Sequence, residues 1–341
     1  MRRACLAATA LTAASVLAFA QWIYKGPLYG CPPEVPLPTV ANVGAWSGEV
    51  HVLMASDRSQ FRGLLVTLLS VARNVADPGK CTLHLVLGAE DMDLVTELLS
   101  CFRRELGDLR VQAPRVELHE VRWPPFNITR FPTFMTKDPG KDDNLWGYRK
   151  PWIWSKVYPH QYMPSVSRAL WLDNDVVVDA DVTPLFRIPM TRPFAVAVDQ
   201  EWTHDINTGV ILYNMDVYQS EAVPRALEAW LERGWSEALD PGGRFASRAF
   251  NEQTGLSELF GPGVEEGRRA QLLDWRWNAV GLWNLWRVGS CVQEAHILHF
   301  NGFPVKYWQF WYPAWTINRW KYDLLRRYAP KSCRALNWTF G

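Results

Sequence analysis

From Glu49 onward, short runs of apolar and β-branched residues alternate with longer segments of helical periodicity. The strand-like runs are Val50–Ala55, Thr82–Leu87 and Arg115–Val121, and the helical segments between them are Phe61–Val75 and Asp91–Leu106. Parallel strands need crossover connections of this length, whereas antiparallel strands are usually joined by short turns. The alternation therefore predicts an α/β fold around a central, mainly parallel sheet.

The second half of the chain continues this pattern less regularly. Further strands are predicted around Trp171, at Ala195–Val198 and at Gly209–Tyr213, and helices at 222–233 and 252–260. The segment Pro124–Asn144 contains several prolines and no clear periodicity, which predicts a long surface loop. In a parallel sheet, ligands collect beyond the carboxyl ends of the strands, so polar residues at those ends are the first candidates for a site.

The N-terminal segment precedes this alternating region. Two arginines follow Met1, and an uncharged, alanine-rich stretch then runs from Ala4 to Tyr24. About 20 such residues span a bilayer, and the arginines favour a cytoplasmic N-terminus. We expect a signal anchor over 1–25 or, with cleavage after Ala18-Phe19-Ala20, a signal peptide. A Pro- and Gly-rich stem at 26–47 and one large domain at 48–341 would follow.

This N-terminus predicts a single-pass type II protein of the Golgi or endoplasmic reticulum membrane with a lumenal domain, or a secreted protein if the segment is cleaved. Five cysteines follow Cys5, at positions 31, 81, 101, 291 and 333. Their odd number predicts one or two disulfides and at least one thiol that is free or intermolecular. No CxxC or Cys/His spacing indicates zinc, and the formal net charge of +1 argues against nucleic-acid binding.

Asp173-Asn174-Asp175 lies directly between two apolar runs, Ala169–Leu172 and Val176–Val178. Two carboxylates in so apolar a setting cost several kcal/mol each unless a cation or hydrogen bonds compensate them. Residues i and i+2 of an extended segment project to the same side, so both acids can face one ion. Carboxylate oxygens suit Mg²⁺ or Mn²⁺ and, through the ion, the phosphates of a substrate. The alternative is a simple turn or helix cap.

The stretch Arg168–Phe186 reads Arg-Ala-Leu-Trp-Leu-Asp-Asn-Asp-Val-Val-Val-Asp-Ala-Asp-Val-Thr-Pro-Leu-Phe. It resembles the strand, Asp-x-Asp and following segment of the family 8 retaining glycosyltransferases, which include glycogenin and the plant galacturonosyltransferases. The resemblance extends from about Val50 to Trp308. It implies a GT-A type, Rossmann-like nucleotide-sugar transferase fold with a central, mainly parallel sheet.

Three further motifs carry the resemblance. The run from Asp205 to Met215 is similar to the family's Asn-Ser/Ala-Gly segment, and Asn251–Thr254 occupies the place of its Asp-Gln-Asp, with Glu252 for the first acid and Thr254 for the second. Ile297–Gly302 resembles the closing His-Phe-x-Gly-x-x-Lys-Pro-Trp motif. This sequence has one extra residue before the lysine and tyrosine in place of the proline.

The resemblance assigns roles to particular residues. It implies metal ligation by Asp173, Asp175 and His299, and donor-sugar or catalytic contacts by Asn207, Glu252 and Gln253. Contacts to the diphosphate or nucleoside are implied for Ala55, Asp57, Lys156, Asn174, Gly302 and Lys306, with Lys150 and Phe61 as weaker candidates. For Lys156 and Glu252 the ordinary alternatives are a solvated lysine and a plain helix N-terminus.

The resemblance thus implies a lumenal, Mn²⁺- or Mg²⁺-dependent glycosyltransferase. The enzyme would move a sugar from a UDP-sugar to a hydroxyl of a glycan or glycoprotein and retain the anomeric configuration. Retention by a front-face route and by double displacement both stay open at this point. The alternatives are an inverting GT-A transferase that shares only Asp-x-Asp and an inactive, transferase-like binding protein.

Overall fold

The computed structural model describes Val35 and residues 48–128, 150–199, 205–238, 250–280, 293–301, 327–331 and 333. The strands are β1 Val50–Ala55, β2 Cys81–Leu87, β3 Arg115–Glu120, β4 Arg168–Leu172, β5 Val176–Val178, β6 Phe194–Val198, β7 Ile206–Asn214, β8 Gln271–Leu272 and β9 Ile297–His299. The α-helices are α2 Phe61–Asn74, α3 Met92–Asp108, α4 Pro151–Trp154, α5 Thr183–Arg187, α6 Met215–Ser220, α7 Val223–Ala238 and α8 Glu252–Phe260. Each strand and helix predicted from the sequence is present, and some of the ends are shifted by a few residues.

Seven of these strands form one sheet in the order β3-β2-β1-β4-β7-β6-β8. The pairings within β3-β2-β1-β4 and between β6 and β8 are parallel, whereas β7 is antiparallel to both β4 and β6. The predicted α/β fold with a mainly parallel central sheet is therefore confirmed. The antiparallel strand β7 has a consequence for function, because its first residues meet the carboxyl end of β4.

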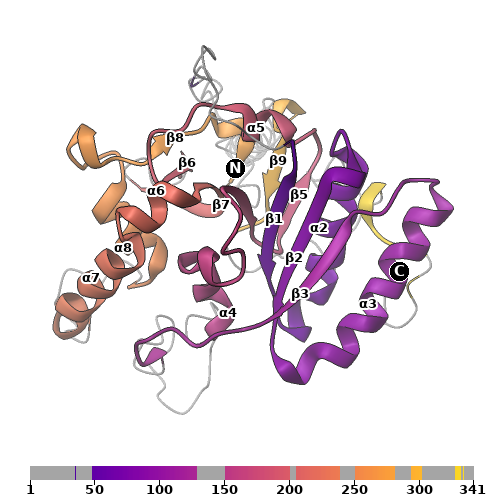
Figure 1. Cartoon of the computed structure of the whole chain (residues 1–341), viewed down its shortest axis with the longest axis horizontal. Coiled ribbons are helices and arrows are strands. Elements are labelled where there is room, and N and C mark those ends of the chain that lie inside the picture. Colours follow the sequence, from indigo (N-terminus) through magenta and orange to yellow (C-terminus); the bar gives the residue numbers. More distant parts are fainter. Residues whose placement is uncertain are drawn as a thin grey trace, which may run out of the picture.

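Two apolar cores cover the two faces of the sheet. In β1, Val52 and Met54 belong to the core that includes α2 and α3, while Leu53 and Ala55 belong to the core that includes α7 and α8. Alternate residues of a strand point to opposite faces, so a strand buried on both sides must be apolar throughout. In Figure 1, α2 and α3 lie beside β1–β3, and α7 and α8 lie at the opposite end of the molecule.

A second, two-stranded sheet pairs β5 with β9 in antiparallel register. Helix α2 holds β5 in place through two hydroxyl groups. Thr67 Oγ1 donates to the carbonyl of Val176 at 2.8 Å, and Ser70 Oγ accepts from the N–H of Val178 at 3.0 Å. These bonds satisfy backbone groups of β5 that would otherwise be buried without partners. They also fix the position of the acidic tripeptide that precedes β5.

A disulfide joins Cys101 of α3 to Cys333, and Cys81 is a buried free thiol. Both observations confirm the expectations from the cysteine count, while Cys31 and Cys291 lie outside the described residues. The disulfide closes a loop with a sequence separation of 232 residues, which strongly restricts the unfolded chain.

We expect Cys101→Ala/Cys333→Ala to lower the free energy of unfolding by about 2–5 kcal/mol, as loss of a native disulfide usually does. Thermal unfolding with and without reductant measures this effect. Reductant should lower the Tm of the wild type by more than it lowers the Tm of the double variant. Equal Tm values for the oxidised wild type and the double variant would contradict the prediction.

The localisation expected from the N-terminus is contradicted. Within the described part of the chain, no helix combines the length and the apolar character needed to cross a membrane. The predicted signal anchor at 1–25 lies outside the described residues, as does the predicted stem at 26–47 apart from Val35. The prediction of a single-pass type II membrane protein thus has no support from the described residues.

Candidate active site

The acidic tripeptide lies where three strands meet. Asp173 follows the last residue of β4, and its N–H donates to the carbonyl of Gly209 in β7 at 2.8 Å. The carbonyl of Asp175 accepts from the N–H of Phe300, just beyond β9, at 2.9 Å. Val176 and His299 are register partners in the β5–β9 pair. Backbone pairing therefore brings a histidine from far along the sequence beside the two acids.

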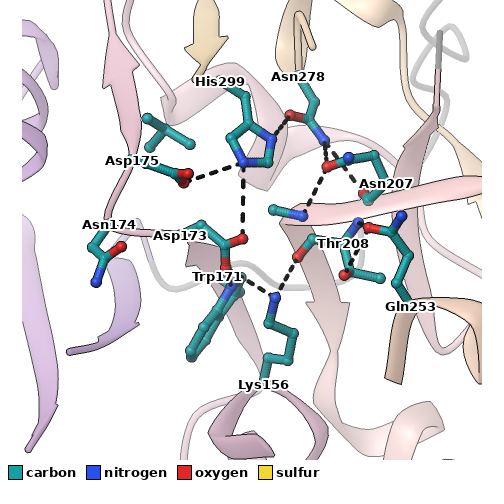
Figure 2. A network of polar contacts seen from close by, with 12 residues as sticks. Lys156, Trp171, Asp173, Asn174, Asp175, Asn207, Thr208, Gln253, Asn278 and His299 are labelled. Atoms are coloured by element: carbon teal, nitrogen blue, oxygen red, sulfur yellow. Dashed lines mark hydrogen bonds and ion pairs between the residues drawn. The ribbon is translucent and has the colours of Figure 1, made fainter. Parts of the chain in front are cut away.

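Asp173, Asp175 and His299 form a cluster whose ligand atoms all lie within 4.8 Å of one another. His299 Nε2 is 3.2 Å from Asp175 Oδ1 and 3.8 Å from Asp173 Oδ2. His299 and Asp175 are buried, and Asp173 is partly exposed. Figure 2 shows the three side chains pointing toward one another. The structure thus brings together the three residues that the resemblance assigned to a metal.

A chain of side-chain amides fixes the orientation of the His299 ring. The N–H of Gly209 donates to Asn207 Oδ1 at 3.0 Å, and Asn207 Nδ2 donates to Asp199 Oδ2 at 3.1 Å. Asn278 Nδ2 donates to the same Asn207 Oδ1 at 2.9 Å, so Asn278 Oδ1 is the atom that faces His299 Nδ1 at 3.0 Å. An amide oxygen is only an acceptor, so Nδ1 carries the proton.

This tautomer leaves the lone pair of Nε2 directed at the two carboxylates. Three electron-rich groups converge on one point, and a cation bound there satisfies all of them at once. Two carboxylate oxygens and one neutral imidazole form a donor set that accepts Mn²⁺ or Mg²⁺. The residues present therefore fit a divalent metal ion, and Asn278 is the partner that orients the histidine ligand.

Lys156 lies on the other side of Asp173. It belongs to a short 3₁₀ helix, Ser155–Val157, and its side chain is only 5% exposed. Lys156 Nζ is 2.9 Å from Asp173 Oδ1 and 3.5 Å from Glu252 Oε1, and it donates to the carbonyl of Thr208 at 3.4 Å. The solvated-lysine alternative is thus excluded. Burial lowers the pKa of Lys156, but Asp173 and Glu252 raise it more, and the net shift is upward.

Glu252 is the first residue of α8, where Asn251 caps the helix by accepting from the N–H of Thr254 at 2.9 Å. Glu252 therefore does lie at a helix N-terminus, as the alternative reading expected. It is also buried against Lys156. Burial raises the pKa of Glu252 despite the neighbouring ammonium group. Its Oε2 atom is buried and has no hydrogen-bond partner among the described residues. Buried polar atoms without a partner are rare, and a ligand that pairs with the atom is one explanation for them.

Two neighbouring side chains reinforce this arrangement. Trp171 Nε1 donates to Asp173 Oδ1 at 2.7 Å, and its ring lies 5.4 Å from Lys156 Nζ. Gln253 Oε1 accepts from the N–H of Thr208 at 3.1 Å, which leaves the amide nitrogen of Gln253 as a donor. Lys156 thus links Glu252 to Asp173, and Asn278 links Asn207 to His299. Gln253 joins this network through Thr208, whose carbonyl accepts from Lys156.

Of the remaining predicted residues, some lie at the end of β1 and others lie outside the described residues. Asn174 Nδ2 donates to Ser56 Oγ at 3.1 Å and lies 3.5 Å from the carbonyl of Ala55, so the tripeptide adjoins the end of β1. Asp57 accepts from the N–H of Ser59 at 2.9 Å and pairs with Lys150, so its carboxylate is already engaged. Gly302 and Lys306 lie outside the described residues.

One weaker candidate is wrong. Phe61 is 2% exposed and packs in the core of α2 and α3, so its ring is not available to stack on a base. Two participants were missed, namely Asn278 and Asp199. Asp199 directly follows β6, and the rule about strand ends could have identified it. Asn278 follows the 3₁₀ helix Trp275–Trp277, and no pattern in the sequence marks it.

Comparisons with known proteins agree with this geometry. A profile of the family described as Glycosyl transferase family 8 matches residues 51–312, most of the chain. No curated protein matches the chain.

Several solved structures share the fold. The chain is similar to the glycosyltransferase GlyE of Streptococcus pneumoniae TIGR4, with a TM-score of 0.55 and 15% identity over 84% of this chain and 63% of that one. It thus spans less than two thirds of GlyE. The chain is also similar to the galactosyltransferase LgtC in complex with donor and acceptor sugar analogs. The TM-score is 0.54 and the identity 16%, over 82% of this chain and 96% of LgtC. For mouse xyloside xylosyltransferase 1 the TM-score is 0.51 and the identity 16%, over 75% of this chain and 100% of the mouse chain. The architecture is therefore that of GT-A glycosyltransferases.

Proposed function

The chain belongs to glycosyl transferase family 8, and on that basis we propose that it transfers a sugar from a UDP-sugar to a hydroxyl of a glycan or glycoprotein acceptor. The protein is a glycosyltransferase, and the donor, the acceptor and the residue roles below are the proposal. We assign the reaction to the domain at 48–341 and expect the product to retain the anomeric configuration of the donor.

The observation that carries the proposal is the convergence of Asp173, Asp175 and His299 at the carboxyl end of β4. Lys156 is the one ammonium group that contacts Asp173 among the described residues, and it is shared with Glu252. The site therefore has an excess of negative charge, which favours a divalent cation, Mn²⁺ or Mg²⁺. When bound there, such an ion stabilises negative charge on a departing diphosphate.

The residues around the cluster hold it in one geometry. Lys156 and Trp171 bind the same oxygen, Oδ1 of Asp173, and so leave Oδ2 directed at His299. Asn278 accepts a hydrogen bond from Nδ1 of His299 and so directs Nε2 toward the two carboxylates. Lys156 also supplies positive charge close to the point where the leaving group would gain charge. Because these ligands are already in place, little energy is needed to reorganise them during the reaction.

Glu252, Gln253 and Asn207 are proposed to orient the donor sugar. The unpartnered Oε2 of Glu252 is an acceptor for a sugar hydroxyl, and the amide nitrogen of Gln253 is a donor. Asn207 is held by Asp199 and Asn278, so its main part is to support His299. A hydroxyl that pairs with Glu252 would remove the penalty of a buried, unpaired carboxylate oxygen.

The end of β1 is proposed to receive the nucleoside. Asn174 lies against Ala55 and Ser56 there, which places an amide group beside the metal ligands and available to a ribose hydroxyl. Asp57 is fixed by Ser59 and Lys150 and shapes this edge of the site. The same end of the strand directs a bound diphosphate toward Asp173 and Asp175.

A panel of UDP-sugars tests the proposal. UDP release would be measured for each donor with acceptor mixtures, in Mn²⁺ and in EDTA. At least one donor should give turnover that EDTA abolishes and Mn²⁺ restores. The anomeric configuration of the product, read by NMR, separates a retaining from an inverting transferase. Absence of turnover and of UDP binding with every donor would indicate an inactive, transferase-like binding protein.

Gly209 provides a steric test of the histidine ligand. A Cβ atom at this position would lie 2.0 Å from His299 Cε1, so Gly209→Ala must displace the imidazole ring. We expect a loss of about 10- to 100-fold in Mn²⁺ affinity and activity, the usual effect of disturbing a ligand's orientation. Mn²⁺ titration and the UDP-release assay measure it.

Gly107→Ala is the matched control, because a Cβ atom there meets nothing within 4 Å. Gly107 lies in helix α3, so alanine should leave Mn²⁺ affinity unchanged and raise stability slightly. Wild-type Mn²⁺ affinity in Gly209→Ala would remove His299 from the proposed ligands.

A further inference from the structure

Three histidines form a ladder across the parallel strands β1, β2 and β3. His51 lies in β1, His84 in β2 and His119 in the edge strand β3. His51 Nδ1 is 3.0 Å from His84 Nε2, and His84 Nδ1 is 3.1 Å from His119 Nε2. His84 is 3% exposed. The proposed transferase reaction uses none of these side chains.

A carboxylate joins the ladder at its outer end. Glu117 is the register partner of His84 in the β2–β3 pair, and it projects to the same face of β3 as His119, two residues further on. Its Oε2 lies 3.4 Å from His84 Nδ1, while its Oε1 is 3.3 Å from Arg115 Nε. Ligand atoms of His84, Glu117 and His119 all lie within 4.8 Å of one another.

These separations are those of ligands around a single metal ion. Zinc–nitrogen and zinc–oxygen bonds are about 2.0–2.2 Å, so two ligands at a tetrahedral angle lie roughly 3.3 Å apart. The distances of 3.1 and 3.4 Å from His84 Nδ1 match that edge length. Glu117 has 41% of its side chain exposed, so an ion can enter from solvent and keep water as a fourth ligand.

At the other end of the ladder, His51 and Glu49 are placed to support His84 as a metal ligand. A metal-bound Nδ1 leaves the proton of His84 on Nε2, from which it is donated to His51 Nδ1. His51 Nε2 then faces Glu49 Oε2 at 3.5 Å. A histidine ligand usually donates its second N–H to a carboxylate or another acceptor, which fixes its tautomer. Glu49, His51 and His84 form such a relay.

We propose that His84, Glu117 and His119 bind a transition-metal ion of the zinc class and hold the edge strand β3 to β2. Two imidazoles and one carboxylate favour Zn²⁺ over the hard ions suited to Asp173 and Asp175. The inference is independent of the proposed transferase function.

Zinc content after equilibration with excess Zn²⁺ and desalting tests the proposal. It is measured in an Asp175→Asn background, which removes one of the three ligands of the other cluster, with Co²⁺ absorption as a spectroscopic check of the ligands. The background protein should retain one zinc ion per chain. Adding His119→Gln or Glu117→Gln should abolish that binding and the visible absorption of bound Co²⁺, while adding His160→Gln should change neither.

His119 and Glu117 are partly exposed residues of an edge strand, so both variants should fold, which circular dichroism verifies. His119→Gln alone should keep the UDP-release rate of the wild type. The proposal is overturned if the Asp175→Asn background binds no zinc. It is equally overturned if the His119→Gln and Glu117→Gln variants bind zinc as the background does.

Discussion

Asp175→Asn is expected to lower kcat/KM for sugar transfer by at least about 10³-fold, or ~4 kcal/mol of transition-state stabilisation. Asp175 is buried, and its Oδ1 lies 3.2 Å from His299 Nε2. The amide keeps the size of the side chain but removes the charge that attracts the cation. The proposed ligand set then has one carboxylate in place of two. UDP release in saturating Mn²⁺ measures the loss.

Asp216→Asn is the control for this experiment. Asp216 is an exposed acid in the first turn of α6, and the same isosteric change there should leave activity within error of the wild type. Circular dichroism should show that both variants are folded. If Asp175→Asn transferred sugar at the wild-type rate, Asp175 could not be a ligand to an essential metal ion.

Lys156→Met is expected to lower the free energy of unfolding by about 3–5 kcal/mol, the usual cost of removing one partner from a buried ion pair. The ammonium group contacts both Asp173 and Glu252, and methionine fills a similar volume without compensating either charge. Because Lys156 also orients Asp173, activity should fall in parallel. Urea denaturation gives the stability, and UDP release gives the activity.

A second substitution separates the charge effect from a packing effect. Glu252→Gln in the Lys156→Met background removes one of the two unpaired carboxylates, so the double variant should be more stable than Lys156→Met alone. Activity should not return, because Glu252 is itself proposed to contact the donor. Lys80→Met, at a side chain that is 64% exposed, should change stability by less than about 0.5 kcal/mol. A Lys156→Met protein as stable as the wild type would contradict the pairing.

The sequence is most informative where local patterns decide the structure. The strand at Val50–Ala55 and the helix at 252–260 were predicted with their observed ends. Strands buried on both faces must be apolar throughout, and helices between parallel strands must be long enough to cross over, so both are visible as patterns. The short strands β5 and β9 were not predicted, because three residues are too few for a period to appear.

The candidate site divides in the same way. Asp173 and Asp175 stand out because two acids in an apolar strand need compensation, and His299 was connected to them only through the family resemblance. Asn278 could not be predicted, since its role depends on a hydrogen bond to His299 across 21 positions of sequence. The ladder of His51, His84 and His119 was invisible for a similar reason. Each histidine lies on a different strand, so their contact depends on the pairing of those strands.

The structure also changes how two predicted residues are understood. Lys156 was expected to contact the diphosphate, but it is buried and bonded to Asp173, so it acts on the proposed site largely by orienting that carboxylate. Phe61 lies in the apolar core, where an aromatic residue on a helix is most often found. In both cases the residue type was compatible with two environments, and only tertiary packing distinguishes them.

Binding of UDP by calorimetry, in Mn²⁺ and in EDTA, tests the central claim most directly, because it requires neither the right sugar nor the right acceptor. If a metal ion holds the diphosphate, UDP binds in Mn²⁺, and EDTA or Asp175→Asn weakens binding at least about tenfold, or ~1.4 kcal/mol. UDP affinity that is absent in Mn²⁺, or equal with and without the metal, would contradict a metal-held diphosphate at Asp173, Asp175 and His299.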